Sequence, residues 1–155
     1  MASAFTSLTY HVVFSTKYRK NRITESLQEE LYKYIGGIVR EQKGVLLEIG
    51  GVADHVHLLA GFSPTVTVSD VLRLIKTNSS KWVNEKADTT RKFQWQTGYA
   101  AFTVSCSQVD VVRRYIQNQE EHHKTLSFRD EFLALLKRHG IEVDMQYVFE
   151  EEHVG

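Results

Sequence analysis

The segment that decides the fold is VLLEIGGVADHVHLLAGF at 45–62. It contains two runs of apolar and β-branched residues, at 45–49 and 55–62, on either side of Gly50-Gly51. Runs of this length and composition predict β-strands, and adjacent glycines between them predict a turn. We therefore expect an antiparallel hairpin in the middle of the chain, and the other elements are placed around it.

The elements that flank this hairpin alternate between strand and helix. Upstream, residues 8–15 predict a strand, and Thr24 predicts the cap of a helix that runs to about Lys43 with its apolar residues on one stripe. Downstream, Ser69 predicts the start of a helix to about Lys86, and a strand is expected at 99–105. The order β-α-β-β-α-β predicts an α+β fold of the ferredoxin-like, split βαβ kind, with an antiparallel sheet and helices packed on one face.

Three more elements are expected after this unit. Ser107 predicts the cap of a helix to about His123, because Asp110 lies where the acid of a capping box would stand. Ser127 predicts a shorter helix that ends near Gly140. Residues 141–149 predict a closing strand.

The composition is typical of a soluble globular protein, with 42% hydrophobic and 25% charged residues. A length of 155 residues predicts one domain over 1–155, with 150–155 as a tail. The start of the chain does not resemble a signal peptide, no apolar run is long enough to span a membrane, and the one cysteine, Cys106, cannot form an internal disulfide. We therefore expect a protein of the reducing cytoplasm.

The formal net charge is zero, from 19 basic and 19 acidic residues. This balance argues mildly against DNA binding, because contacts with phosphates need local positive charge. The charges are unevenly distributed, however, with four basic residues at 17–22 and three consecutive glutamates at 150–152. A neutral total can therefore include a basic face.

The first candidate site is the pair His55 and His57, separated by Val56. Residues two apart on a strand point to the same face, so both imidazoles are expected on one side and Val56 in the core. Two imidazoles on a rigid strand provide half of a metal site. The alternative is that both are surface histidines on the solvent face of the strand.

The second candidate site is formed by Tyr115 and Gln119, which lie four residues apart on a predicted helix and therefore share a face. The alternative is an ordinary core stripe with Gln119 at its polar edge. Taken with the histidine pair, these residues suggest a neutral site in which two imidazoles and an amide oxygen bind Mg²⁺ or Mn²⁺ and polarise a phosphate. Tyr115 would be the nucleophile, and its ordinary pKa of about 10 means that it needs activation.

A third feature is the run Glu120-Glu121-His122-His123. Adjacent helical residues point about 100° apart, so the two histidines are poor joint ligands for one ion. A solvated helix end accounts for the run, because cationic histidines suit the helix dipole there. The rival interpretation is a zinc site formed by His55, His57 and either His122 or His123.

Basic and aromatic residues are interleaved in two stretches, KYRKNR at 17–22 and RKFQW at 91–95. Single-stranded nucleic acids are bound by positive grooves with aromatic side chains on which bases stack. A solvated loop and a strand with buried rings explain the two stretches equally well. The candidate DNA-binding residues are Lys17, Arg19, Lys20, Arg22, Arg91 and Lys92, together with Arg113 and Arg114 beside Tyr115.

Together these residues resemble a known family, the single-tyrosine HUH transposases of bacterial insertion sequences (the TnpA type). The resemblance covers most of residues 8–149 in matching order and spacing, which makes it more specific than either short motif. It is carried by YHVVFSTKYRKNRI at 10–23, DHVHLLAGFSP at 54–64, LRLIKTNSSKW at 72–82, WQTGYAAFTVS at 95–105 and YIQNQEEHH at 115–123.

The resemblance implies a metal-dependent transposase that cleaves and rejoins single-stranded DNA through a 5′-phosphotyrosine intermediate. His55, His57 and Gln119 would be the metal ligands, and Tyr115 would be the nucleophile. The DNA partner would include hairpins near element ends. Members of the family are typically homodimers, in which the tyrosine helix can complete the metal site of the other subunit.

Three other functions fit the same residues. A nucleic-acid-binding regulator on this scaffold would bind DNA or RNA without cleaving it. A zinc hydrolase would retain its activity after loss of Tyr115. A domesticated endonuclease that processes repeats in its host genome would look the same at the level of these motifs.

Overall fold

The computed structural model describes residues 4–86, 92–144 and 148–149. One antiparallel sheet has the strand order β2-β3-β1-β4. Its strands are β1 (Thr9–Ser15), β2 (Val45–Val52), β3 (His55–Gly61) and β4 (Ala100–Thr103). The predicted α+β fold with a split βαβ order is therefore confirmed.

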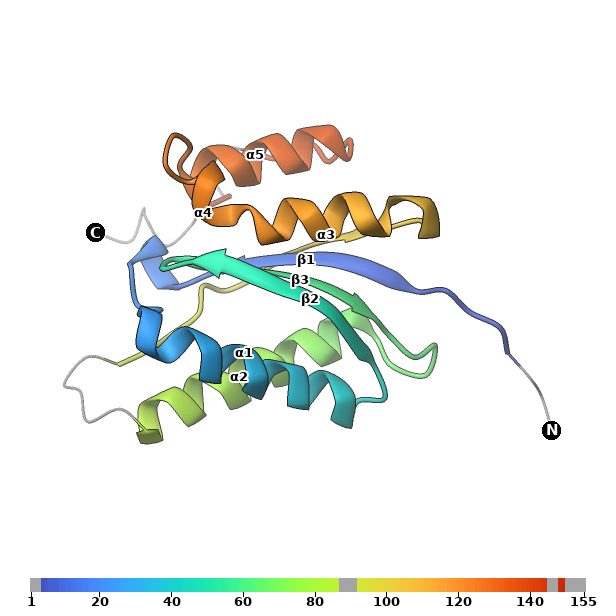
Figure 1. The fold of residues 1–155 in the computed structure, drawn as a ribbon, viewed down its shortest axis with the longest axis horizontal. Coiled ribbons are helices and arrows are strands. Elements are labelled where there is room, and N and C mark those ends of the chain that lie inside the picture. The colour runs from blue at the N-terminus through green and yellow to red at the C-terminus, as the bar shows by residue number, and fades with distance from the viewer. Residues whose placement is uncertain (1–3, 87–91, 145–147, 150–155) are drawn as a thin grey trace.

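Helices cover both faces of this sheet (Figure 1). The helices α1 (Glu25–Glu41) and α2 (Val68–Lys86) lie together on one face, as the split βαβ pattern predicts. The helices α3 (Val109–Gln117), α4 (Gln119–His122) and α5 (Phe128–Arg138) form a second layer on the opposite face. Two short 3-10 helices, η1 (Lys17–Arg19) and η2 (Cys106–Gln108), lie in the connections. The expected packing of helices on one face of the sheet is therefore correct for α1 and α2, but a second layer of helices covers the other face.

Strand β3 is buried on both sides because it lies between these layers. Val56, Leu58 and Ala60 belong to the core that α1 and α2 share with the sheet. His55, His57 and Leu59 alternate with them and therefore point to the layer of α3, α4 and α5. Both imidazoles are fully buried, so the alternative of two surface histidines is wrong.

The first helical layer forms as its apolar pattern predicts. Leu31 and Ile35 of α1 and Leu72 and Ile75 of α2 are fully buried in one core. Thr24 caps α1, where its hydroxyl accepts a hydrogen bond from the Leu27 amide at 3.2 Å. Local periodicity and a capping side chain thus determine this layer.

The predicted turn at Gly50-Gly51 is wrong, because β2 continues through both glycines to Val52 and the chain turns at Ala53-Asp54. The glycines are instead required by close contacts. A Cβ at Gly50 would lie 2.6 Å from the Ile116 carbonyl oxygen of α3, and one at Gly51 would lie 2.2 Å from the His55 carbonyl oxygen. The missing side chain at Gly50 lets α3 approach the sheet.

The predicted helix starts are correct in part. Ser127 caps α5 by accepting a hydrogen bond from the Asp130 amide at 3.1 Å. Thr67, not Ser69, caps α2 through the Asp70 amide, and α2 begins at Val68. Ser107 lies inside η2 and does not cap a helix. The helix expected to run to His123 is interrupted at Asn118, whose φ of −97° and ψ of 19° separate α3 from α4.

The closing strand expected at 141–149 is not found in its described residues, 141–144 and 148–149. Gly140 has a φ of 69°, and the Ile141 amide donates to the Leu136 carbonyl, which turns the chain back at the end of α5. Ile141 and Val143 then line a cavity of about 640 Å³ together with residues of β4, so they do not pair with that strand. Arg91 and the expected tail at 150–155 lie outside the described residues.

A search of the described part of the chain finds no helix that is both long and apolar enough to cross a membrane.

The close approach at Gly50 predicts that Gly50→Ala destabilises the protein by about 1–3 kcal/mol, because the new methyl group pushes against the α3 backbone. Urea denaturation measures this loss. Gly61→Ala is the matched control, since a Cβ at this position of β3 meets nothing within 4 Å. Equal stability of the two variants would contradict the close packing of α3 on β2.

Candidate active site

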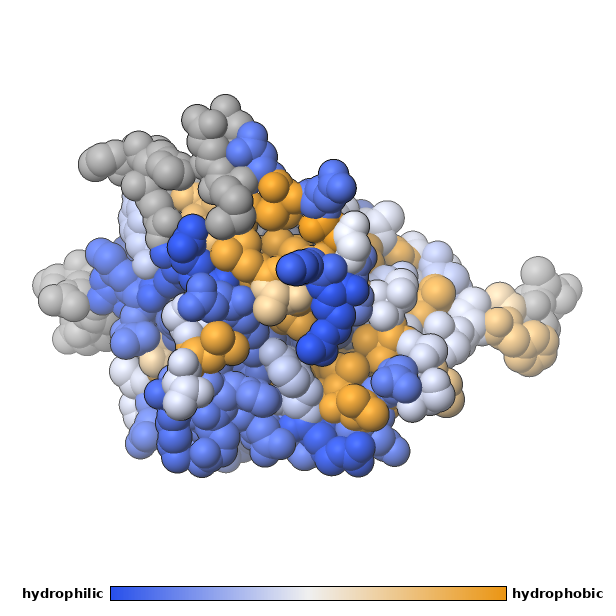
Figure 2. All heavy atoms as spheres, turned by 90° about the horizontal axis from the view of Figure 1, so that it is seen from above, coloured by the Kyte–Doolittle hydropathy of each residue, from blue (hydrophilic) through white to orange (hydrophobic). Residues whose placement is uncertain are grey.

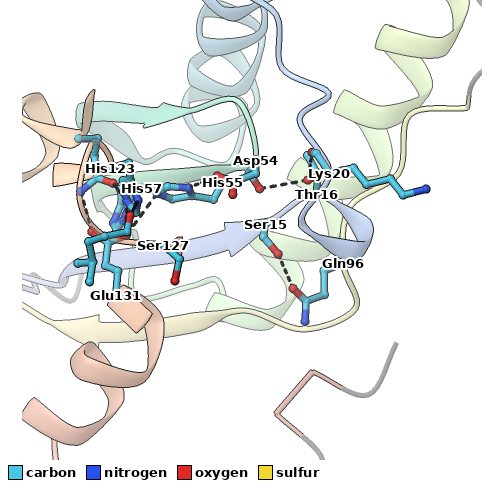
Figure 3. Close-up of polar contacts among 12 residues, drawn as sticks. Ser15, Thr16, Lys20, Asp54, His55, His57, Gln96, His123, Ser127 and Glu131 are labelled. Carbon is cyan, nitrogen blue, oxygen red and sulfur yellow. Dashed lines mark hydrogen bonds and ion pairs between the residues drawn. The ribbon is translucent and has the colours of Figure 1, made fainter. Parts of the chain in front are cut away.

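Two buried imidazoles on β3 form the centre of the site, and each has one ring nitrogen held by a neighbour. His55 Nδ1 lies 2.7 Å from Asp54 Oδ1, and His57 Nδ1 lies 2.8 Å from His11 Nε2 on β1. Figure 3 shows Asp54 beside the His55 ring. These contacts fix both rings with Nε2 directed away from β3 and toward the second helical layer. In histidines that bind a metal through one ring nitrogen, the other ring nitrogen is typically held by a hydrogen bond of this kind.

Residues of α3 and α4 reach this centre from above the sheet. Gln119 Oε1 lies 2.8 Å from His55 Nε2, and the Gln119 side chain is 1% exposed. The Tyr115 ring lies with its centroid 5.8 Å from that of His57. The structure therefore brings together all four residues that the two sequence motifs indicate: His55, His57, Tyr115 and Gln119.

Glu131 of α5 connects the histidines to the tyrosine. Its Oε1 lies 3.0 Å from His57 Nε2 and 3.3 Å from His55 Nε2. Its Oε2 accepts hydrogen bonds from Gln119 Nε2, at 2.9 Å, and from the Tyr115 hydroxyl. The side chain is only 2% exposed. One carboxylate thus faces the imidazoles with one oxygen and the phenol with the other.

His123, at the end of α4, is a further imidazole at this carboxylate. Its Nε2 lies 3.0 Å from both Glu131 Oε1 and Gln119 Oε1. Figure 3 shows His123, His57 and Glu131 gathered together. His122 points elsewhere, because its ring lies against Tyr115 with the centroids 4.9 Å apart. Of the two histidines in the rival zinc interpretation, only His123 adjoins the centre.

The charges of the site are strongly coupled. Burial disfavours a charge on His55, but the hydrogen bonds and charges of Asp54 and Glu131 outweigh it and raise the pKa of His55 to about 9. Burial lowers the pKa of His57 to about 4 and that of His11 to about 3. Burial disfavours the charge on Glu131 as well, but hydrogen bonds from His123, His55 and His57 hold the pKa of its carboxyl far below the usual range. The carboxyl of Glu131 is therefore held in its ionised form.

The tyrosine is held in its protonated form. Burial is the main effect that raises the pKa of Tyr115 above that of an ordinary phenol, and the hydrogen bond to Glu131 and its charge add to it. Arg138 at the end of α5 acts in the opposite direction, because its positive charge favours the phenolate. The resting site therefore holds a neutral phenol beside a buried carboxylate.

The donor set fits a divalent cation. One nitrogen from each of His55 and His57 and one oxygen of Glu131 all lie within 4.8 Å of one another. Two imidazole nitrogens, a carboxylate oxygen and the nearby amide oxygen of Gln119 form a mixed nitrogen and oxygen site. Such a site suits Mg²⁺, Mn²⁺ or Zn²⁺, so the chemistry of the ligands does not select one metal.

Sequence reasoning missed Glu131 and His11. Glu131 follows Ser127 and Asp130 in the first turn of α5, where an acidic residue is expected for the helix dipole alone. His11 lies in the predicted strand at 8–15, and its alternation with Val12 placed it on the face opposite the core. Only the pairing of β1 with β3 in the sheet brings it beside His57.

The predicted DNA-binding residues fall into separate groups. Those at 17–22 adjoin the turn before His55, because the Arg22 amide donates to the Ala53 carbonyl and the Thr16 amide to the Asp54 carbonyl. Lys17 and Lys20 lie over the ring of Tyr18. Lys92 is exposed and lines a groove of about 710 Å³ beside α2. Arg114 is exposed on α3, while Arg113 is partly buried.

Comparison with known proteins shows the family to which the chain is related. The family model described as "Transposase IS200 like" matches residues 4–119. The transposase for insertion sequence element IS200 of Salmonella typhimurium is 32% identical over 124 residues, which cover 74% of this chain and 78% of the relative.

Two solved structures share the fold. A crystal structure described as a candidate transposase of Deinococcus radiodurans has a TM-score of 0.61 at 24% identity, covering 77% of this chain and 95% of the other. The structure of a REP-associated tyrosine transposase bound to a REP hairpin has a TM-score of 0.62 at 13% identity, covering 81% of this chain and 76% of the other.

The fold and the site define a transposase-type protein with a buried histidine, histidine and glutamate cluster. The chain belongs to the IS200-like transposases of insertion sequences. The family match ends at residue 119, so it includes His55, His57, Tyr115 and Gln119 but neither His123 nor Glu131.

The cluster predicts that a divalent cation stabilises the protein through Glu131. At a Mn²⁺ concentration of 100 times Kd, binding should contribute about 2.7 kcal/mol and raise Tm by roughly 5–10 °C. Glu131→Ala and His57→Ala should each abolish most of this shift in a thermal melt. Asp130→Asn is the matched control, since Asp130 is the exposed neighbour of Glu131 on α5. A Glu131→Ala variant with the full Mn²⁺ shift would rule out this ligand.

Proposed function

We propose that the chain is a metal-dependent transposase that cleaves and rejoins single-stranded DNA through a 5′-phosphotyrosine formed on Tyr115. The observation that carries this proposal is the convergence of the Tyr115 hydroxyl and the His55 and His57 imidazoles on one buried carboxylate. The closeness of these groups supports a site in which a tyrosine nucleophile and a bound metal act on one phosphodiester.

The reaction is a direct exchange of one phosphate ester for another. The Tyr115 oxygen attacks the phosphorus, the bond to the 3′-oxygen breaks, and the DNA 5′-phosphate stays on the tyrosine. The phenol loses its proton and the leaving 3′-oxygen gains one, so the products are a phosphotyrosine and a free 3′-hydroxyl. Attack by a 3′-hydroxyl on the phosphotyrosine reverses these steps and rejoins the strand without another source of energy.

His55, His57 and Gln119 are the proposed ligands of Mg²⁺ or Mn²⁺, with Glu131 as an additional carboxylate ligand. A divalent cation bound there would polarise a phosphate oxygen and offset the charge of Glu131. Asp54 and His11 hold the two imidazole rings in the orientation that the ligands require. Glu131 also accepts the hydrogen of the Tyr115 hydroxyl and thereby fixes the position of the nucleophile.

The basic residues at 17–22 are proposed to guide single-stranded DNA to the site. Their support is position, because this segment hydrogen-bonds to the turn that precedes His55. Lys92, Arg113, Arg114 and, outside the described residues, Arg91 are proposed as further phosphate contacts. A solved structure with the same fold is bound to a REP hairpin, and we propose hairpins at element ends as the DNA that this chain recognises.

We also propose that the protein is a single domain that acts in the cytoplasm, as its length and composition suggest, and that it forms a homodimer, as its family resemblance implies. Each site is proposed to be completed within one chain. The contacts of Tyr115 and Gln119 with Glu131 and of Gln119 with His55 all lie in the same chain and support this arrangement.

The proposed reaction predicts a covalent protein–DNA adduct with labelled single-stranded DNA from the flanks of the gene, in Mg²⁺ or Mn²⁺. A denaturing gel detects it. Tyr115→Phe should abolish the adduct, because the nucleophile is lost, and a chelator should do the same. Tyr99→Phe is the matched control, since Tyr99 lies before β4 and has no contact with the histidine cluster.

The outcomes separate the candidate functions. An adduct that persists in Tyr115→Phe would exclude Tyr115 as the nucleophile. DNA binding without any adduct in the unaltered protein would favour the non-cleaving regulator. Hydrolysis that needs zinc and survives the loss of Tyr115 would favour the hydrolase.

Completion of the site within one chain predicts that two inactive variants cannot rescue each other. A mixture of Tyr115→Phe and His57→Ala subunits, refolded together, should form no adduct, because neither chain contains both residues. Adduct formation at about a quarter or more of the unaltered rate would instead require the tyrosine of one subunit to act at the histidines of another.

A further inference from the structure

A separate cavity of about 410 Å³ adjoins Tyr115. It lies between the connection from β4 to α3, the first turns of α3 and the end of α5. Its walls include Tyr115 and His11 but none of His55, His57, Gln119 and Glu131. A second cavity, of about 590 Å³, adjoins the site through Asp54 and His123.

The cavity beside Tyr115 has the chemistry of a site for a nucleoside. Val104, Val111, Val112 and Leu135 provide apolar walls, which suit the faces of a base. Ser105 and Gln108 provide donors and acceptors for the edge of a base. Its volume falls in the usual range of small-ligand pockets. Figure 2, seen from above, shows apolar areas among hydrophilic residues on this face of the molecule.

Arg138 gives the cavity a positive charge. It is exposed at the end of α5 and has no ion-pair partner within residues 4–86, 92–144 and 148–149. It lines the same cavity as Tyr115. A guanidinium at this position suits a phosphate that follows a base in the cavity, because its planar donors match phosphate oxygens.

The geometry of attack decides which nucleoside the cavity takes. In an in-line displacement the leaving 3′-oxygen lies opposite the attacking oxygen, so the nucleoside that leaves points away from Tyr115. The nucleoside that is attached through its 5′-oxygen projects to the side and stays on the tyrosine after cleavage. A cavity with Tyr115 in its wall is therefore placed for this second nucleoside.

We propose that the cavity bounded by Val104, Val111 and Arg138 binds the nucleoside directly 3′ of the scissile phosphate, with Arg138 contacting the next phosphate. This inference rests on the proposed function, because it assumes that Tyr115 attacks DNA. It adds a binding site for one nucleotide, and it assigns the polarity of the strand across the site. It also places part of DNA recognition on α5, beyond the segment that the family model matches.

The first experiment locates the cleaved bond from the adduct and then removes single bases. In the unaltered protein, an abasic residue directly 3′ of the bond should slow adduct formation by about tenfold, since stacking and edge contacts of one base are lost. A rate that is unchanged by the abasic residue on the 3′ side would overturn the assignment.

The second experiment maps the nucleoside without requiring cleavage. Tyr115→Phe protein is mixed with the same DNA, in which 4-thiothymidine or 6-thioguanine, matched to pyrimidine or purine, replaces the base on either side of the bond. Near-ultraviolet light should cross-link the 3′ base to peptides that contain residues 103–112 or 135–139. Cross-links of the 3′ base to residues 120–128, or none at all, would overturn the proposal.

A variant pair tests the role of Arg138. In the Tyr115→Phe background, Arg138→Gln should weaken DNA binding by about tenfold, as expected for a lost charged hydrogen bond. Lys137→Gln removes the same charge from the neighbouring exposed position, which does not line the cavity, and should weaken binding far less. Equal losses would mean that Arg138 acts only through net charge. An absence of adduct in the unaltered protein would refute the proposed function itself, so the two failures are distinguishable.

Discussion

The contact on which the rest of the site depends is the buried carboxylate of Glu131 among the side chains of His55, His57, His123, Gln119 and Tyr115. A buried charge is costly unless it is paired and hydrogen-bonded, and here both oxygens have partners. Because the partners belong to β3, α3 and α4, one side chain of α5 fixes four elements relative to each other. The orientation of Tyr115 and the closure of the second helical layer are thus consequences of the same contact.

Local patterns predicted the residues whose signal lies within one element. His55 and His57 share a face because β3 is a strand, and Tyr115 and Gln119 share a face because a helical turn separates them. The break at Asn118 does not prevent this, since both side chains still donate to Glu131 Oε2. The apolar stripes of α1 and α2 were predicted for the same reason, since a period of 3.6 residues is visible in the sequence alone.

What the sequence could not predict depends on contacts between distant segments. Glu131 lies 74 residues from His57, and nothing in its own helix distinguishes it from an acid that suits the dipole. Gly50 and Gly51 suggested a turn because adjacent glycines often form one. The close contacts that require them, with the α3 backbone and the His55 carbonyl, exist only in the assembled fold. The prediction of a closing strand at 141–149 was wrong in its described residues for a similar reason. Gly140 turns the chain at the end of α5, and Ile141 and Val143 then face a cavity.

The position of Glu131 after the other residues of the site has a consequence for the newly made chain. The histidine pair and Tyr115 emerge from the ribosome before α5, so the sheet can form while its second layer lacks the carboxylate. During that interval the imidazoles of His55, His57 and His123 lack the carboxylate of Glu131 as a partner, and the Tyr115 hydroxyl lacks its hydrogen-bond acceptor. Completion of the buried cluster is therefore tied to the arrival of α5 in translation, and the early nascent chain holds Tyr115 without the carboxylate that fixes its hydroxyl.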